Sequence, residues 1–373
     1  MSSKTSRQSN IELLRVFAAM GVIILHLNNR NLGGIAGKAD RFGLCQFVLV
    51  FLGVFAVTAV NVFVLITGYF QARKKKADLY RPLKLILDVL IFAAIFFAAY
   101  RIMTGGTYPL SEFVARFIPS NWFILVYSGL YILSPFINKL WNSLKSREKI
   151  TLVTAVFLLY SVYPLIIDQL HIEGTTTYGL DGDQRGYNIV NFVLMYLIGC
   201  ALRDLDENKD EAKKAASKML KISESSIKSS IIPVLLVLNA GMILGMIYLG
   251  AYFSGNHPYS SMMFYYNNPL TITLTVLLFL SFKSLKIRDS KVINYVARSA
   301  FYVYIIHLHF IRFFNVAAIV IDDALPMLGF MLGMTLMIYL VCFAIFAVYD
   351  LTFGKLLNII AKKWQKRRFI EVE

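Results

Sequence analysis

Residues 44–70 read LCQFVLVFLGVFAVTAVNVFVLITGYF and contain no charged side chain. A helix rises about 1.5 Å per residue, so roughly 20 apolar residues are enough to cross the hydrocarbon core of a bilayer. This run is longer than that minimum. It therefore predicts a membrane-spanning helix that tilts or extends beyond the bilayer to accommodate its extra length.

The rest of the chain repeats this pattern. Hydrophobic residues make up 57% of the 373 residues and charged residues only 16%, which is not the balance of a soluble globular domain. We expect an all-α, polytopic transmembrane bundle of about ten helices. The predicted helices lie near residues 11–28, 44–70, 83–103, 122–141, 150–170, 187–203, 231–253, 268–283, 294–320 and 326–352.

The distribution of positive charge predicts the orientation. Of the 38 Lys and Arg residues, 29 lie before the first predicted helix, in every second loop between predicted helices, and in the C-terminal tail. The other loops hold five. Cytoplasmic loops are enriched in Lys and Arg, so we expect both termini in the cytoplasm. A nucleic-acid surface would instead gather its basic residues on one folded face, so the net charge of +16 does not indicate a nucleic-acid partner.

The same patterns predict the domain organisation. Residues 1–353 form one membrane-embedded domain, with a polar cytosolic insertion at 203–230, and residues 354–373 form a basic cytoplasmic tail. The three cysteines have neither metal-ligand spacing nor the even number of a disulfide framework. We expect no metal centre and no permanently bound cofactor.

Ionisable residues within the predicted spans are the first functional candidates. Each costs about 2.5–3.5 kcal/mol at helix-centre depth on insertion scales, so each needs a partner or a water-filled cavity. Among these residues, Arg15 and His26 have the most informative spacing. Eleven steps of roughly 100° end about 20° from three full turns, so both side chains face one direction, roughly 16 Å apart along the axis. The candidates are Arg15, His26, Asp88, Arg298, His307, His309 and Arg312.

The geometry of Arg15 and His26 favours a channel for an extended ligand that is anionic at its cytosolic end and reactive at its deep end. An acyl-CoA thioester has this shape. Arg15 could bind part of the donor, and His26 could act as general base on an acceptor hydroxyl. The alternative is structural: Arg15 pairs with Glu12 or reaches lipid headgroups, and His26 bonds a neighbouring helix. Spacing alone leaves both interpretations open.

The ninth predicted helix holds a second cluster. Tyr304 and His307 share a helix face, so His307 could complete the same cavity or make a structural hydrogen bond between helices. Arg312 needs a counter-charge at its depth, and Asp88 is a candidate partner.

Basic residues at the cytoplasmic side could bind the donor. The run 73–76, RKKK, follows the second helix and could attract acyl-CoA phosphates or anionic lipid, or could serve only to set the topology. We assign Arg73, Lys74 and Arg298 to donor binding.

Four stretches resemble the bacterial membrane acyltransferase 3 family. Residues 10–26, NIELLRVFAAMGVIILH, contain the family's pattern of Arg, ten residues and His at Arg15 and His26. Thr67 is a departure, because many relatives have Ser before the Gly-Tyr or Gly-Phe pair, but threonine keeps the hydroxyl. The other stretches are NVFVLITGYF at 61–70, NWFILVYSGLYILSPFINKL at 121–140 and YVYIIHLHF at 302–310.

The resemblance implies about ten helices, cytosolic acyl-CoA as donor and an acceptor sugar hydroxyl on the outer side of the membrane. Family members include O-acetyltransferases of lipopolysaccharide, enterobacterial common antigen and capsule. By resemblance, His26 is the catalytic residue and Arg15 its essential companion. The residues expected to bind substrate are Tyr69, Trp122, Tyr304 and His307.

The function predicted from the sequence is a membrane O-acyltransferase in the bacterial cytoplasmic membrane. It would move an acyl group, most simply acetyl from acetyl-CoA, to a cell-surface or lipid-linked glycan. The expected partners are acyl-CoA, this acceptor, the lipid bilayer and glycan-assembly machinery. Direct transfer and a covalent acyl-enzyme both remain open.

Two other functions are alternatives. A proton-coupled transporter or flippase would also use intramembrane Arg, His and Asp, but it predicts internal repeats with paired broken helices, and the sequence has no internal repeat. A non-enzymatic sensor or assembly partner would use the same residues only for helix packing.

Overall fold

The computed structural model describes most of the chain. The described residues are 7–29, 32–107, 109, 111, 122–170, 172, 179–182, 184–208, 231–314, 316, 319, 321–355 and 369–371.

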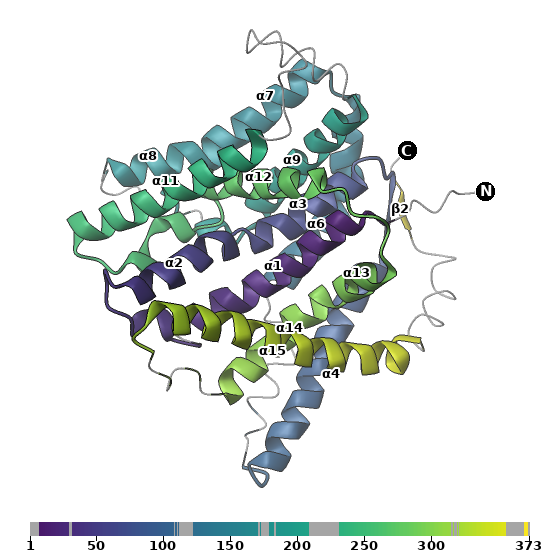
Figure 1. Cartoon of the computed structure of the whole chain (residues 1–373). Coiled ribbons are helices and arrows are strands. Elements are labelled where there is room, and N and C mark those ends of the chain that lie inside the picture. Colours follow the sequence, from purple (N-terminus) through teal and green to yellow (C-terminus); the bar gives the residue numbers. More distant parts are fainter. Residues whose placement is uncertain are drawn as a thin grey trace.

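Almost all of the regular structure is helical, as predicted (Figure 1). The one described sheet pairs two short antiparallel strands, β1 (Lys76–Asp78) and β2 (Phe369–Glu371). A π-helical segment, Leu158–Val162, joins α7 to α8. The described α-helices are α1 (Ser9–Asn28), α2 (Leu44–Ala56), α3 (Ala59–Gln71), α4 (Tyr80–Met103), α6 (Trp122–Ser143), α7 (Ser146–Phe157), α8 (Tyr163–Gln169), α9 (Ile189–Glu207), α11 (Ile231–Ser254), α12 (Pro269–Ser284), α13 (Lys291–Val296), α14 (Ala300–Phe313) and α15 (Ala324–Leu351).

The prediction of membrane-spanning helices is confirmed in part. Within the described residues, seven helical segments are long and apolar enough to cross a membrane. Each of the ten predicted runs contains helix, but α9, α12 and α14 do not meet the same criteria, so the count of ten stays a prediction. The seven segments are Ser9–Asn28, Leu44–Gln71, Tyr80–Met103, Trp122–Ser143, Ser146–Gln169, Ile231–Ser254 and Ala324–Leu351.

Besides the helix predicted for 150–170, which contains the π-helical segment, two predicted helices are interrupted. The span 44–70 divides into α2 and α3 at Val57 and Thr58, where the Thr58 hydroxyl donates to the Phe55 carbonyl at 2.7 Å. The single helix predicted for 294–320 is wrong. A 3₁₀ turn separates α13 from α14, which ends at Phe313, and the Ser299 hydroxyl donates to the Val296 carbonyl at that turn. In both places a hydroxyl competes for a helix carbonyl, which bends or ends helices.

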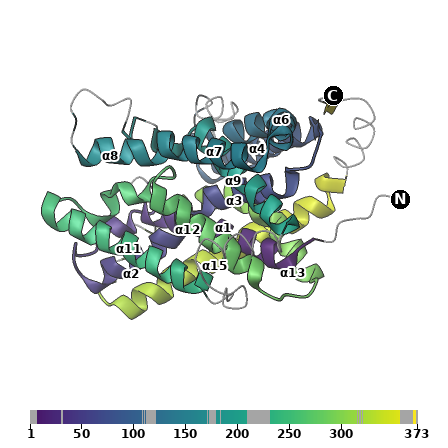
Figure 2. The same cartoon turned by 90° about the horizontal axis from the view of Figure 1, so that it is seen from above.

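Helix α1 is the centre of the bundle. It packs against α2, α3, α12, α13, α14 and α15, and it lies in the middle of the molecule in Figure 1. Figure 2 shows α6, α7 and α8 gathered along one side of the molecule. The helix with Arg15 and His26 is therefore surrounded by protein along most of its length.

The most extensive helix pair is α3 with α9, and two glycines allow its close approach. A Cβ atom added to Gly68 would lie 2.2 Å from the Tyr196 carbonyl oxygen, and one added to Gly199 would lie 2.3 Å from the Leu65 carbonyl oxygen. Small residues let membrane helices pack backbone against backbone. The glycine of the Thr-Gly-Tyr stretch is therefore explained by packing.

Segments predicted to be cytoplasmic lie together at one end of the bundle, here called the basic end. Lys149 on α7 contacts Asp204 on α9 at 2.7 Å, and Lys283 on α12 contacts Asp206 at 2.6 Å. Asn10 at the start of α1 donates to the Lys283 carbonyl at 2.9 Å. This clustering is consistent with the prediction that every second loop, rich in Lys and Arg, lies on the same side of the membrane. The cytoplasmic location of this end stays a prediction.

The predicted insertion and tail are described in part. Helix α9 runs to Glu207, so the first residues of the predicted insertion 203–230 are helical, and residues 209–230 lie outside the described residues. In the predicted tail 354–373, strand β2 returns to pair with β1 directly after α3.

Candidate active site

Arg15 and His26 open onto two separate cavities. The basic-end cavity, about 450 Å³, is lined by Arg15 and by residues of α3, α4, α6, α14 and α15. The distal cavity, about 440 Å³, lies at the other end of α1 and is lined by His26 and by loop residues before α9 and α12. Both volumes are typical of ligand sites. One helix therefore serves two cavities, where the sequence had predicted one channel.

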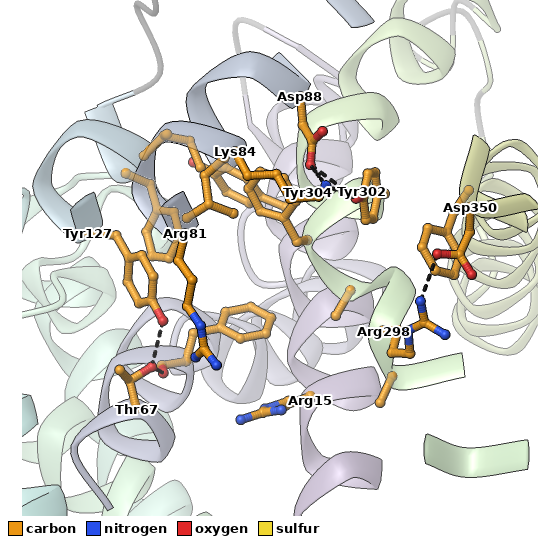
Figure 3. Close-up of a pocket in the computed structure, with 18 of the residues that line it drawn as sticks. Arg15, Thr67, Arg81, Lys84, Asp88, Tyr127, Arg298, Tyr302, Tyr304 and Asp350 are labelled. Carbon is orange, nitrogen blue, oxygen red and sulfur yellow. Dashed lines mark hydrogen bonds and ion pairs between the residues drawn. The ribbon is translucent and has the colours of Figure 1, made fainter. Parts of the chain in front are cut away.

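The basic-end cavity is cationic. Arg15 Nη1 lies 3.0 Å from Glu12 Oε1, as in the structural alternative, and Arg298 Nη2 lies 2.7 Å from Asp350 Oδ1 (Figure 3). Arg81 has no carboxylate partner among the described residues and lies over the Tyr131 ring. Five cations thus face three carboxylates. The charged lining residues are Arg7, Arg15, Arg81, Lys84, Arg298, Glu12, Asp88 and Asp350.

Asp88 is held by a partner that the sequence analysis missed. Its carboxylate pairs with Lys84 Nζ at 2.5 Å and accepts hydrogen bonds from Tyr302 Oη at 3.0 Å and Tyr349 Oη at 2.6 Å. The side chain of Arg312, the predicted partner, lies outside the described residues. The spacing of Lys84 and Asp88, four residues apart on one helix, was the signal that could have identified this pair.

An aromatic wall of Phe63, Phe123 and Tyr304 bounds the basic-end cavity. The Phe123 ring lies 4.9 Å from the Tyr304 ring and 6.5 Å from the Phe63 ring. Tyr304 lies one turn before His307, whose ring contacts His26 of the distal cavity. Tyr304 therefore connects this wall to the histidine pair at the distal cavity.

His26 is joined to α14 by a hydrogen bond between imidazoles. His26 Nδ1 lies 2.8 Å from His307 Nε2, and His307 Nδ1 lies 2.8 Å from the Val303 carbonyl oxygen. The His307 side chain is 0% exposed. His26 thus makes the interhelical bond of the structural alternative and also lines a cavity, whereas His307 lies behind it.

The distal cavity has a different lining. Apart from Arg185, its polar residues are tyrosines, asparagines, serines and the two histidines, His26 and His257. Arg185 has a φ of 55°, uncommon for a residue with a side chain, and its carbonyl accepts a hydrogen bond from the Tyr266 amide at 2.9 Å. The aromatic lining residues are Tyr187, Tyr259, Phe264, Tyr265 and Tyr266.

Trp122 supports this lining from behind. Its ring lies 4.5 Å from the ring of Tyr187 and 6.0 Å from that of Tyr266. The sequence analysis singled out neither Arg185 nor these tyrosines, which the fold brings together from separate loops.

Besides Trp122 and His307, three more predicted site residues line neither cavity. Tyr69 Oη donates to Asp206 at 2.6 Å and accepts from Lys283. Arg73 pairs with Asp204 and Glu207. Partial burial and the nearby Arg81 charge lower the pKa of Lys74. Their predicted roles at the site stay predictions, and Arg298 is the predicted donor-binding residue that lines a cavity.

The described residues contain no group of three or more His, Cys, Asp or Glu side chains that could hold a metal ion.

Comparisons with known proteins identify the family. A family model described as an acyltransferase domain matches residues 8–347. No curated protein and no solved structure matches the chain. The match runs from the start of α1 into α15 and includes Arg15, His26 and nearly all the residues that line the two cavities. The chain therefore belongs to the acyltransferase 3 family and is a membrane acyltransferase.

Proposed function

We propose that the protein transfers an acyl group, acetyl in the simplest case, from cytosolic acyl-CoA to a glycan hydroxyl on the outer side of the bacterial cytoplasmic membrane. The acceptor is a cell-surface or lipid-linked glycan. The observation that carries this proposal is the placement of Arg15 and His26 on one helix, open to different cavities. Donor and acceptor can approach from opposite sides, so only the acyl group needs to cross.

The basic-end cavity suits the donor. Coenzyme A carries its phosphates at one end and its thioester at the other. Carboxylates orient Arg15 and Arg298. The guanidinium group of Arg81 has no carboxylate partner within the described part of the chain. Guanidinium groups bind phosphate oxygens through paired hydrogen bonds, which favours this cavity for an anionic ligand. The thioester then points toward the aromatic wall.

The distal cavity suits a sugar acceptor. Aromatic rings such as Tyr187 and Tyr266 can pack against the apolar face of a pyranose, and Asn28, Asn29 and Arg185 supply hydrogen-bonding groups. The lining is mostly polar, which suits a ligand that is rich in hydroxyl groups.

His26 is the base in this mechanism. Its ring accepts the proton of the acceptor hydroxyl as that oxygen attacks the thioester carbonyl carbon. The tetrahedral intermediate collapses with cleavage of the carbon–sulfur bond. The proton then passes from His26 to the leaving sulfur, giving the acyl ester and coenzyme A thiol. For the thioester to reach His26, side chains of the aromatic wall must rotate aside.

The test is label transfer in inside-out membrane vesicles that contain the acceptor glycan. Radiolabelled acetyl-CoA is supplied on the exposed cytoplasmic face, and wild type is compared with His26→Gln at equal abundance. The matched control is His309→Gln, because His309 stacks on Phe96 outside both cavities. We expect glycan label with wild type and the control and none with His26→Gln.

Near-normal label with His26→Gln would remove this residue from the mechanism. Absence of label with wild type, repeated with longer acyl-CoAs and added glycans, would overturn the proposed reaction and favour the transporter alternative.

A further inference from the structure

The two imidazoles at the contact of α1 and α14 form a directed hydrogen-bond chain. The Val303 carbonyl, His307 and His26 follow one another with two nitrogen contacts of 2.8 Å, and the imidazole centroids lie 4.8 Å apart. His307 is fully buried behind His26. His307 thus contacts neither proposed substrate site, and any role it has must act through His26.

The chemistry of the chain determines where its protons lie. A carbonyl oxygen only accepts, so His307 Nδ1 must carry a proton to bond Val303. A charged His307 would be buried against two neutral partners, which is costly, so the ring is neutral and its Nε2 has a lone pair. Nε2 can then only accept, and His26 must donate from Nδ1. The free lone pair of His26 is on Nε2, the nitrogen left to face the distal cavity.

We propose that His307 is a positioning residue that holds His26 in the tautomer with its proton on Nδ1, so that Nε2 is the base. The tautomer of an imidazole is set by the hydrogen bond of its other nitrogen. The catalytic consequence of this inference rests on the proposed function, whereas the tautomer itself does not.

The same contact stabilises His26 after proton transfer. When Nε2 takes the acceptor's proton, the Nδ1 proton stays on His26 and its hydrogen bond to the His307 lone pair becomes charge-assisted. His307 therefore orients His26 and stabilises its protonated form, as the carboxylate of a Ser-His-Asp triad does for its histidine, but without placing a negative charge in the membrane. The Nε2 proton later leaves with the sulfur, so His307 undergoes no net change.

Nitrogen NMR on protein labelled with ¹⁵N-histidine tests the tautomer without any assay of transfer. The chain has five histidines, and the His26→Gln and His307→Gln variants assign the two that matter. His257 is an internal reference for the opposite tautomer, because its Nδ1 accepts from the Tyr259 amide. We expect both His26 and His307 to carry the proton on Nδ1.

In His307→Leu we expect His26 to become a mixture of tautomers. A wild-type His26 protonated on Nε2, or a His26 tautomer that is unchanged in His307→Leu, would overturn the proposal.

Transfer kinetics test the consequence for activity. Leucine at position 307 cannot accept a hydrogen bond, so we expect the rate to fall on the order of 10²-fold with the KM for acyl-CoA unchanged. Glutamine places an amide oxygen near the Nε2 position and should recover most of the rate. In His307→Glu a carboxylate stabilises protonated His26, so the acid limb of the pH–rate profile should move to higher pH.

A merely structural role would lower the amounts of Leu and Gln variants alike and leave the acid limb unmoved, which would overturn the positioning role. If the NMR result holds and wild type transfers no acyl group from any acyl-CoA, the proposed function fails and the tautomer assignment stands.

Discussion

The two cavities have nearly equal volumes, about 450 and 440 Å³, but opposite chemistry. The basic-end cavity is built from ion pairs and has an excess of positive charge. The distal cavity is built mainly from tyrosines and other neutral polar groups, with Arg185 as a charged lining residue. One helix therefore presents Arg15 to a cation-rich cavity at one end and the His26 imidazole to a different cavity at the other. On the proposed function, this asymmetry matches an anionic donor and a neutral acceptor.

The largest effect should come from a substitution that disturbs both cavities together. Helix α3 supplies Phe63 and Thr67 to the basic-end cavity, and its packing on α9 needs Gly68. Gly68→Ala places a methyl group against the Tyr196 carbonyl, so the helices must separate. We expect most of the folded protein to be lost, measured as monodisperse protein recovered in mild detergent.

Gly241→Ala on α11 is the matched control, because a Cβ atom there meets nothing within 4 Å. Equal recovery of the two variants would mean that α3 and α9 can separate without harm and that the cavities do not depend on this contact.

The next effect should be confined to the basic-end cavity. Arg15→Lys keeps a positive charge beside the buried Glu12 but loses the planar group that binds phosphate through two hydrogen bonds. We expect kcat/KM for acyl-CoA to fall roughly 30-fold, equivalent to about 2 kcal/mol for charged hydrogen bonds, with the acceptor KM unchanged. Arg147→Lys, an exposed position at the same end, is the control. A rise in acceptor KM instead would show that the cavities do not divide the substrates.

A smaller effect should appear only on the acceptor. Tyr187 packs on Trp122 and Tyr266 at the rim of the distal cavity. Tyr187→Ala removes an aromatic contact worth about 1 kcal/mol, so we expect the acceptor KM to rise roughly fivefold while the acyl-CoA KM stays constant. Tyr252→Ala, exposed on α11, should change neither constant. Together, Arg15→Lys and Tyr187→Ala thus test whether the basic-end cavity binds only the donor and the distal cavity binds only the acceptor.

The sequence predicted those features that depend on neighbours along the chain. Apolar length indicated the helices, the alternation of Lys and Arg indicated which connections lie together, and the eleven-residue spacing placed Arg15 and His26 on one face of α1. The ion pair of Lys84 with Asp88 could also have been predicted, because these residues lie only four positions apart on α4.

The sequence could not show which helices meet. The contact between His26 and His307 joins residues 281 positions apart, and the aromatic wall of the basic-end cavity combines side chains from α3, α6 and α14. Arg73 was assigned to the donor from its charge, yet carboxylates at the end of α9 bind it, and nothing local to Arg73 indicates them. Long-range packing therefore decides which charges are available to a ligand.

The smallest expected effect concerns pH and the basic end. Partial burial alone would raise the pKa of Glu207, but hydrogen bonds from Arg73 and Arg203 hold that pKa below its ordinary value. A carboxyl with a lowered pKa stabilises the fold above its unfolded-state pKa, and this contribution disappears as the pH falls through the folded-state value.

We therefore expect the midpoint of thermal unfolding of detergent-solubilised protein to drop between pH 7 and pH values below about 4, with Glu207→Gln dropping by less. Asp40→Asn, an exposed position at the distal end, should drop as much as wild type. If Glu207→Gln and wild type drop equally, the ion pairs that gather the basic end contribute little to its stability. The asymmetry between the two ends would then serve ligand binding alone.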